Sequence, residues 1–264
     1  MIKRTITVVV GLPIVLLLVY LGGLPLILFC IAMALVGLKE LYMALSGKHL
    51  PIHWVGYGFA VAYFAVLHFL TYGAVMIALT AFVIAIQVAL VIFFNKLTLK
   101  DCIATVYGAL YIPFLLGFIV LVRGHELGHY FVWLIFTSAF GCDTFAYLAG
   151  TTIGKHKLKG TPSPNKSVEG LFGGVIGAAG VGALYGLGVV RFGTPDSQFV
   201  IQATVISAVG AVFCIFGDMA ASAIKRHTGI KDFGNLFPGH GGVVDRIDSI
   251  LLAAPVIFVF MTYL

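Results

Sequence analysis

Residues 222–248 combine acidic, basic and glycine residues in a pattern suited to binding phosphate groups. Arginine forms paired hydrogen bonds with phosphate oxygens, whereas lysine acts as a point charge. Glycines around a histidine let the backbone approach an anion closely, because they lack a side chain and reach positive φ. We therefore predict that this segment binds phosphate, and that Lys225 and Arg226 are catalytic. The residues of the segment predicted to bind substrate are Ser222, Lys231, Asp232, His240, Gly241, Gly242 and Arg246.

Four aspartates are placed so that their carboxylates could meet. Asp143 and Asp218 stand inside apolar runs, where an acid costs about 2.5–3.5 kcal/mol and usually marks a functional site. The alternative for each is a structural hydrogen bond between helices, or a proton relay. Asp245 and Asp248 are three residues apart, which puts both on one helical face.

Clustered carboxylates repel one another unless a cation is bound, and oxygen ligands suit Mg²⁺. We predict that Asp218, Asp245 and Asp248 hold Mg²⁺, with Asp143 facing the same cavity. A second cation, for which K⁺ is the candidate, is expected at the same site. Asp143, Asp218 and Asp245 are therefore predicted to be catalytic.

The chain that must position these residues has the composition of a membrane protein. Of its 264 residues, 61% are hydrophobic and 10% are charged, against about 25% charged in soluble domains. Apolar runs of about 20 residues cross a bilayer as helices, because lipid leaves no partner for unpaired backbone groups. We predict an all-α, polytopic integral membrane helical bundle of nine transmembrane helices, at 5–22, 24–45, 53–71, 73–94, 101–122, 130–151, 168–190, 198–222 and 247–264.

The distribution of Lys and Arg predicts how this bundle is oriented. With the N-terminus in the cytoplasm, fourteen of the sixteen basic residues face the cytoplasm, and only Arg123 and Arg191 lie outside. The active site is then expected at the cytoplasmic membrane interface of the cell (plasma or inner) membrane. No soluble domain is apparent. We interpret 1–264 as a single membrane domain, with N-terminal helices over about 1–125 and the catalytic half over about 126–264.

These motifs resemble those of the phosphatidate cytidylyltransferases, also called CDP-diacylglycerol synthases. Fourteen residues between Ser222 and Asp248 match the family signature, and a second similarity covers about 140–170, including an S-P-x-K-x-x-E-G stretch at 163–170. One departure is Val168, where many relatives have an aromatic residue. The first five helices carry no comparable signature.

The resemblance implies that CTP and phosphatidate react to give CDP-diacylglycerol and pyrophosphate. It also implies that Ser163 and Lys166 close the site from the neighbouring loop, and that the protein forms a homodimer in the lipid bilayer. A nucleic-acid partner is not expected.

A competing motif lies at His125, Glu126 and His129, which spell the H-E-x-x-H pattern of zinc metallopeptidases. In those enzymes the two histidines lie one turn apart on a helix and hold zinc, while the glutamate acts as base. Here the predicted topology puts the motif in a short outer loop, and no third ligand of the usual type follows. We favour a polar connector between helices, with a membrane zinc metalloprotease or an adventitious outer metal site as alternatives.

A membrane transporter is the other class to weigh, because intramembrane aspartates in a helical bundle also suit transport. A transporter has little use for a fixed K-R-x4-K-D block followed by H-G-G and D-R-x-D in one loop. The D-G-x2-A-R block of the CDP-alcohol phosphatidyltransferases is absent. The cytidylyltransferase interpretation is therefore favoured over both.

Overall fold

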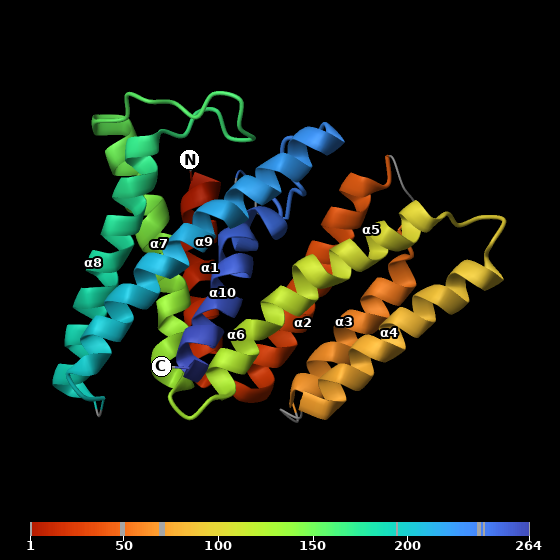
Figure 1. The fold of residues 1–264 in the computed structure, drawn as a ribbon, viewed down its shortest axis with the longest axis horizontal. Coiled ribbons are helices and arrows are strands. Elements are labelled where there is room, and N and C mark those ends of the chain that lie inside the picture. The colour runs from red at the N-terminus through yellow and green to blue at the C-terminus, as the bar shows by residue number, and fades with distance from the viewer. Residues whose placement is uncertain are drawn as a thin grey trace. The chain divides into compact units, whose positions relative to one another are not determined.

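A computed structural model describes residues 2–47, 51–68, 72–193, 195–236, 239 and 241–263, and the regular elements within them are helices (Figure 1). Helices cover most of the described residues in each of the nine predicted segments, which confirms the all-α prediction. The helices are α1 (Ile2–Leu21), α2 (Gly23–Leu45), α3 (His53–His68), α4 (Tyr72–Ile92), α5 (Leu99–Ala109), η1 (Leu110–Phe114), α6 (Leu115–Gly124), α7 (Gly128–Thr152), α8 (Val168–Phe192), α9 (Gln198–Thr228) and α10 (Val244–Tyr263).

Six helical segments of the described chain are long and apolar enough to cross a bilayer. They are Gly23–Leu45, Gly73–Ile92, Leu99–Gly124, Gly128–Thr152, Val168–Phe192 and Gln198–Thr228. Helix α3 has 16 residues in the described part of the chain, fewer than a bilayer normally requires. The chain thus has the helices of an integral membrane protein, while the prediction of nine crossings stays a prediction.

The predicted 101–122 helix is interrupted by a π-helical turn. Pro113 lies within η1 and has no N–H to donate, and its ring crowds the carbonyl one turn earlier. A wider turn relieves this conflict while the helix continues on both sides as α5 and α6.

The chain divides into two compact units. One consists of Met1–Gly124 with His227–Arg246, and the other of His125–Arg226 with Ile247–Leu264. The predicted single membrane domain stays a prediction.

In the first unit, helices α2, α3 and α5 pack around the buried side chain of Tyr42, and α3 and α4 lie side by side (Figure 1). Tyr42 donates its hydroxyl hydrogen bond to the Thr105 carbonyl oxygen at 3.0 Å. Gly56 and Gly108 face the Tyr42 ring so closely that a methyl group at either position would overlap it. This unit carries few charged groups in its interior, which makes the buried Glu40 of α2 notable.

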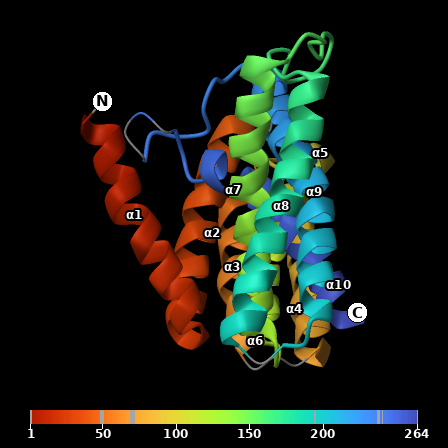
Figure 2. The ribbon, with the colours of Figure 1, turned by 90° about the vertical axis from the view of Figure 1, so that its left-hand side faces the viewer.

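The second unit is built on close contacts through glycine. Helices α7 and α8 lie side by side (Figure 2), with Gly174 and Gly177 of α8 facing α7. Gly210 of α9 faces Ser138 of α7, and Gly217 of α9 faces the backbone at Asp248 of α10. Small residues let membrane helices approach closely enough for dense van der Waals packing. The helices that carry the predicted aspartates are thereby brought together.

The loop between α7 and α8 has its own backbone structure. Lys157 and Ser167 form an isolated β-bridge, and Leu158 N donates to Lys166 O at 3.0 Å. The Ser167 hydroxyl then accepts a hydrogen bond from Gly170 N and caps α8. These bonds fix the backbone on both sides of Lys166.

We predict that Gly177→Ala lowers the melting temperature of the detergent-solubilised protein, because the added methyl group would overlap Phe145 of α7. Overpacking costs about 1–3 kcal/mol. The control is Gly180→Ala on the same helix, where a methyl group meets nothing within 4 Å. That control should be neutral or stabilising, since alanine favours helices by about 1 kcal/mol over glycine. Equal melting temperatures for the two variants would contradict the proposed packing.

Candidate active site

An ion pair joins the loop between α7 and α8 to helix α9. The Lys166 Nζ atom contacts the Asp218 Oδ2 atom, and the two side chains are 33% and 31% exposed. Solvent screens a pair with this exposure, so its contribution to stability is about 1 kcal/mol or less. Its main effect is positional, because it fixes a predicted substrate-binding lysine against a predicted catalytic carboxylate.

A second contact repeats this connection one helical turn further along α9. Ser163 Oγ donates a hydrogen bond to Ser222 Oγ at 3.0 Å. Asp218 and Ser222 are four residues apart and therefore lie on the same helical face. The structure thus brings together four residues that the sequence assigned to one site from two separate motifs.

Asp248 of α10 lies in the same charged cluster. Its side chain is buried, and it lies close enough to Asp218, Lys225 and Asp143 for their charges to interact with its carboxylate. The charges of Asp143, Lys166 and Asp218 likewise act on Cys142, which lies beside them on α7. Three of the four predicted carboxylates and two predicted lysines therefore gather within the second unit.

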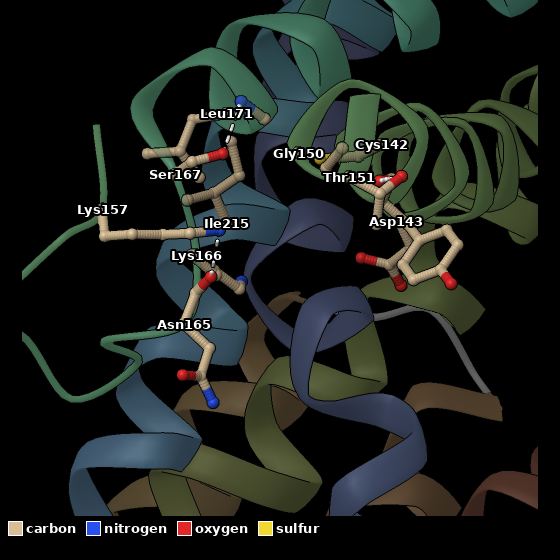
Figure 3. Close-up of a pocket in the computed structure, with 13 residues that line it drawn as sticks. Cys142, Asp143, Gly150, Thr151, Lys157, Asn165, Lys166, Ser167, Leu171 and Ile215 are labelled. Carbon is tan, nitrogen blue, oxygen red and sulfur yellow. Dashed lines mark hydrogen bonds between the residues drawn. The ribbon is translucent and has the colours of Figure 1, made fainter. Parts of the chain in front are cut away.

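A pocket of about 390 Å³ opens beside this cluster (Figure 3). Lys157, Asn165 and Lys166 stand on one side, and Asp143 stands on the other. Apolar groups, among them Leu171, complete the lining. A pocket with cationic, anionic and apolar walls suits a ligand that has both a charged group and an apolar part.

In the first unit, Asp245 holds the glycine-rich segment by accepting two backbone hydrogen bonds. Its Oδ2 atom accepts from Phe233 N at 2.9 Å and from Gly242 N at 3.0 Å. Gly241 has a φ of 81°, which glycine adopts without strain. Because Asp245 already engages the Gly242 N–H, the predicted phosphate-cradling roles of Gly241 and Gly242 stay predictions. His240 lies outside the described residues.

Most of the remaining residues predicted to bind phosphate have exposed side chains. Arg226, Lys231, Asp232 and Arg246 are exposed, whereas Lys225 is half-buried. Exposed guanidinium and ammonium groups are accessible to an anionic ligand and take part in no packed core. Their assignment to substrate binding stays a prediction.

Glu40 is a buried acid that was not among the predicted site residues, and it lies against Gly234 and residues 242–244 of the signature segment, which we define as residues 222–248. Glu40 lies in α2 and accepts hydrogen bonds from Val243 N and Val244 N, both at 3.0 Å. The same signal that singled out Asp143 and Asp218 applied here, since Glu40 is an acid within the apolar 24–45 run. Its partner was not visible in the sequence, because it lies 203 residues away.

The predicted magnesium ligands come from both units, since Asp218 and Asp248 belong to the second unit and Asp245 belongs to the first. Within the described residues, no three His, Cys, Asp or Glu side chains are placed to share an ion. Asp218 is paired with Lys166, and Asp248 Oδ1 accepts a hydrogen bond from Ser249 N at 2.7 Å. The predicted magnesium site at Asp218, Asp245 and Asp248 therefore stays a prediction.

The H-E-x-x-H motif does not form the geometry of a zinc site. Helix α7 begins at Gly128, so His125 and Glu126 precede it while His129 lies within its first turn. The histidines are therefore not one turn apart on a helix, as zinc binding in metallopeptidases requires. Leu127 N instead donates to His125 Nδ1 at 3.4 Å. The motif is an exposed connector, as favoured from the sequence.

We predict that Asp218→Asn speeds hydrogen–deuterium exchange of backbone amides in residues 158–167 by about three- to fivefold, because it removes the charge that holds Lys166. A part-exposed ion pair contributes about 1 kcal/mol or less, which corresponds to such a factor. The control is Thr151→Val in the same pocket, whose hydroxyl donates within α7 to Tyr147 O or Leu148 O. Unchanged exchange in Asp218→Asn would show that the ion pair does not hold the loop.

Comparison with known proteins gives the family. The chain matches the cytidylyltransferase family over residues 2–264. It is 29% identical over 261 residues to the phosphatidate cytidylyltransferase of Staphylococcus epidermidis, and 31% identical over 265 residues to that of Staphylococcus saprophyticus, with 98% of each chain covered in both cases. It is 35% identical over 160 residues to the Thermotoga maritima phosphatidate cytidylyltransferase, covering 61% of this chain and 59% of that protein. This chain is a member of the cytidylyltransferase family.

Proposed function

We propose that this protein transfers a cytidylyl group from CTP to phosphatidate, giving CDP-diacylglycerol and pyrophosphate for phospholipid synthesis. The observation that carries the proposal is the pairing of the two family motifs through Lys166–Asp218 and Ser163–Ser222. Relatives that cover nearly the whole chain bear the name of this activity. Neither a transporter nor a zinc protease accounts for the joined motifs.

In the proposed reaction, a phosphate oxygen of phosphatidate attacks the α-phosphorus of CTP. A new P–O bond forms there, the bond to the bridging oxygen breaks, and the electron pair leaves with pyrophosphate. The attacking oxygen is already anionic, so a strong general base is not required. The barrier comes mainly from repulsion between two anionic groups, and fixed positive charges lower it.

The side chains of this chain supply such charges at defined positions. Lys166 is held by Asp218 and lines the pocket, where it offsets the charge of a bound phosphate. Lys225 follows Asp218 by seven residues on α9 and so lies near the same face, two turns on. Arg226, Lys231 and Arg246 are exposed and are proposed to contact the triphosphate or the lipid phosphate.

We propose that the protein lies in the cell membrane with its N-terminus and active site on the cytoplasmic side. Six apolar helical segments of spanning length among the described residues support a membrane location, and the Lys and Arg bias supports the orientation. A lipid substrate and a water-soluble nucleotide meet most readily at such an interface. A homodimer remains part of the proposal on the family resemblance alone.

The activity test uses purified protein with CTP, Mg²⁺ and phosphatidate, and measures CDP-diacylglycerol without any membrane gradient. We predict that Asp218→Asn and Asp245→Asn each lower turnover by more than 100-fold, because each frees the group that its carboxylate holds. His125→Ala is the control and should stay within twofold of the parent rate. Near-full activity of both aspartate variants would remove these carboxylates from the mechanism, and an inactive His125→Ala variant would revive the outer metal site.

We further propose that turnover requires Mg²⁺, which when bound would offset phosphate charge, with K⁺ as a candidate second cation. Removal of divalent cations with EDTA is expected to lower the rate by more than tenfold, and added Mg²⁺ should restore it. The rate is measured at matched ionic strength, so that screening of surface charges does not change. Full activity in EDTA would exclude a required divalent cation.

A further inference from the structure

Glu40 is buried in α2 and binds the start of α10 with both of its carboxylate oxygens. Oε1 accepts a hydrogen bond from Val243 N, and Oε2 accepts one from Val244 N, each at 3.0 Å. We propose that Glu40 is a positioning residue that fixes the glycine-rich part of the signature segment and, through it, Asp245 and Arg246. The proposal rests on the proposed function for its catalytic consequence, though not for its structural part.

The chemistry of a helix N-terminus explains why a carboxylate suits this position. The first N–H groups of a helix have no partner within it, and aligned peptide dipoles make that end partly positive. A buried carboxylate with two acceptor oxygens satisfies two such donors at once. A glutamine would offer one oxygen and turn an NH₂ group toward the second donor, leaving that N–H without an acceptor.

Two glycines of the signature segment are explained by the same carboxylate. A methyl group at Gly234 or at Gly242 would overlap the Glu40 carboxylate, although neither glycine has a positive φ. The backbone therefore passes the carboxylate at two places eight residues apart. A side chain at either position would push the segment away from α2.

The contact extends along α2 and passes into the segment through backbone bonds. Gly37, three residues before Glu40, packs against the Val244 side chain, where a methyl group would lie 3.6 Å from its Cγ2 atom. Gly242 N donates to Asp245 Oδ2, and Arg246 N donates to Val243 O at 2.9 Å. Residues 242–246 are thus joined by hydrogen bonds and rest on α2. A displacement of Val243 and Val244 would therefore also displace the side chains of Asp245 and Arg246.

The test compares Glu40→Gln with the parent protein in two measurements. The first is hydrogen–deuterium exchange over residues 241–247, which we expect to become at least tenfold faster in the variant. The second is kcat and KM for CTP, measured well below the melting temperature. The protein used is the folded fraction that elutes from size-exclusion chromatography at the position of the parent. We expect kcat to fall by at least tenfold, since Asp245 and Arg246 would no longer be held in place. Glu126→Gln, an exposed acid in the connector before α7, is the control and should change neither measurement.

Gly234→Ala provides a second variant that keeps the carboxylate and disturbs only its contact. Its control is Gly47→Ala, where a methyl group meets nothing within 4 Å. We expect Gly234→Ala to lower kcat at least fivefold and Gly47→Ala to leave it unchanged. If Glu40→Gln does not fold, Gly234→Ala decides the outcome.

The possible outcomes separate this proposal from the proposed function. A folded Glu40→Gln protein with parental exchange over 241–247 would overturn the positioning role, whatever the activity. Faster exchange with unchanged kcat would reduce Glu40 to a structural cap and also overturn it. If the parent protein makes no CDP-diacylglycerol, the proposed function fails, and the exchange data still decide whether Glu40 holds the segment.

Discussion

Every carboxylate buried in an apolar chain must find a partner, because an unpaired charge away from water costs several kcal/mol. The acids of this chain meet this constraint with two kinds of partner. In the second unit Asp218 pairs with a lysine from the adjoining loop. In the first unit Glu40 and Asp245 accept backbone N–H groups instead. The hydrogen-bond or ion-pair partner of each carboxylate determines which parts of the signature segments are held rigidly. The arrangement of the site therefore follows from the partners of these acids.

Glycine makes this arrangement possible, for two separate reasons. In α8 and α9 it lets helices approach one another, so that Asp143, Asp218 and Asp248 are carried into one cluster. In the signature segment it lets the backbone pass directly against carboxylates, as at Gly242. Gly241 and Gly242 of the signature are predicted from the sequence to cradle phosphate, which stays a prediction. In the structure, Gly234 and Gly242 leave room for the Glu40 carboxylate, because a side chain at either position would overlap it.

The helices could be predicted because apolar runs of spanning length have few alternatives to helix. The turn at Pro113 shows the limit, since a proline indicates a disturbance without specifying a π-helical turn. Site residues within one helix could be related by spacing, as with Asp218 and Ser222. The contact between Ser163 and Ser222 joins segments 59 residues apart, and only the family resemblance suggested it. Glu40 was missed because nothing in the sequence pairs an acid in α2 with backbone N–H groups 203 residues later.

The balance of charge in the second unit bears on how the site could receive two phosphate-bearing substrates. Asp143, Asp218 and Asp248 face two lysines, Lys166 and Lys225, which leaves this cluster with one formal negative charge. A triphosphate and a phosphate monoester would add to that negative charge. Further positive charge must therefore come from exposed basic side chains or from a cation that enters with the nucleotide. A nucleotide that binds alone would add negative charge to this cluster, and a cation that binds alone would leave positive charge uncompensated. Binding of a nucleotide together with its counterion is therefore favoured, because the two charges offset each other.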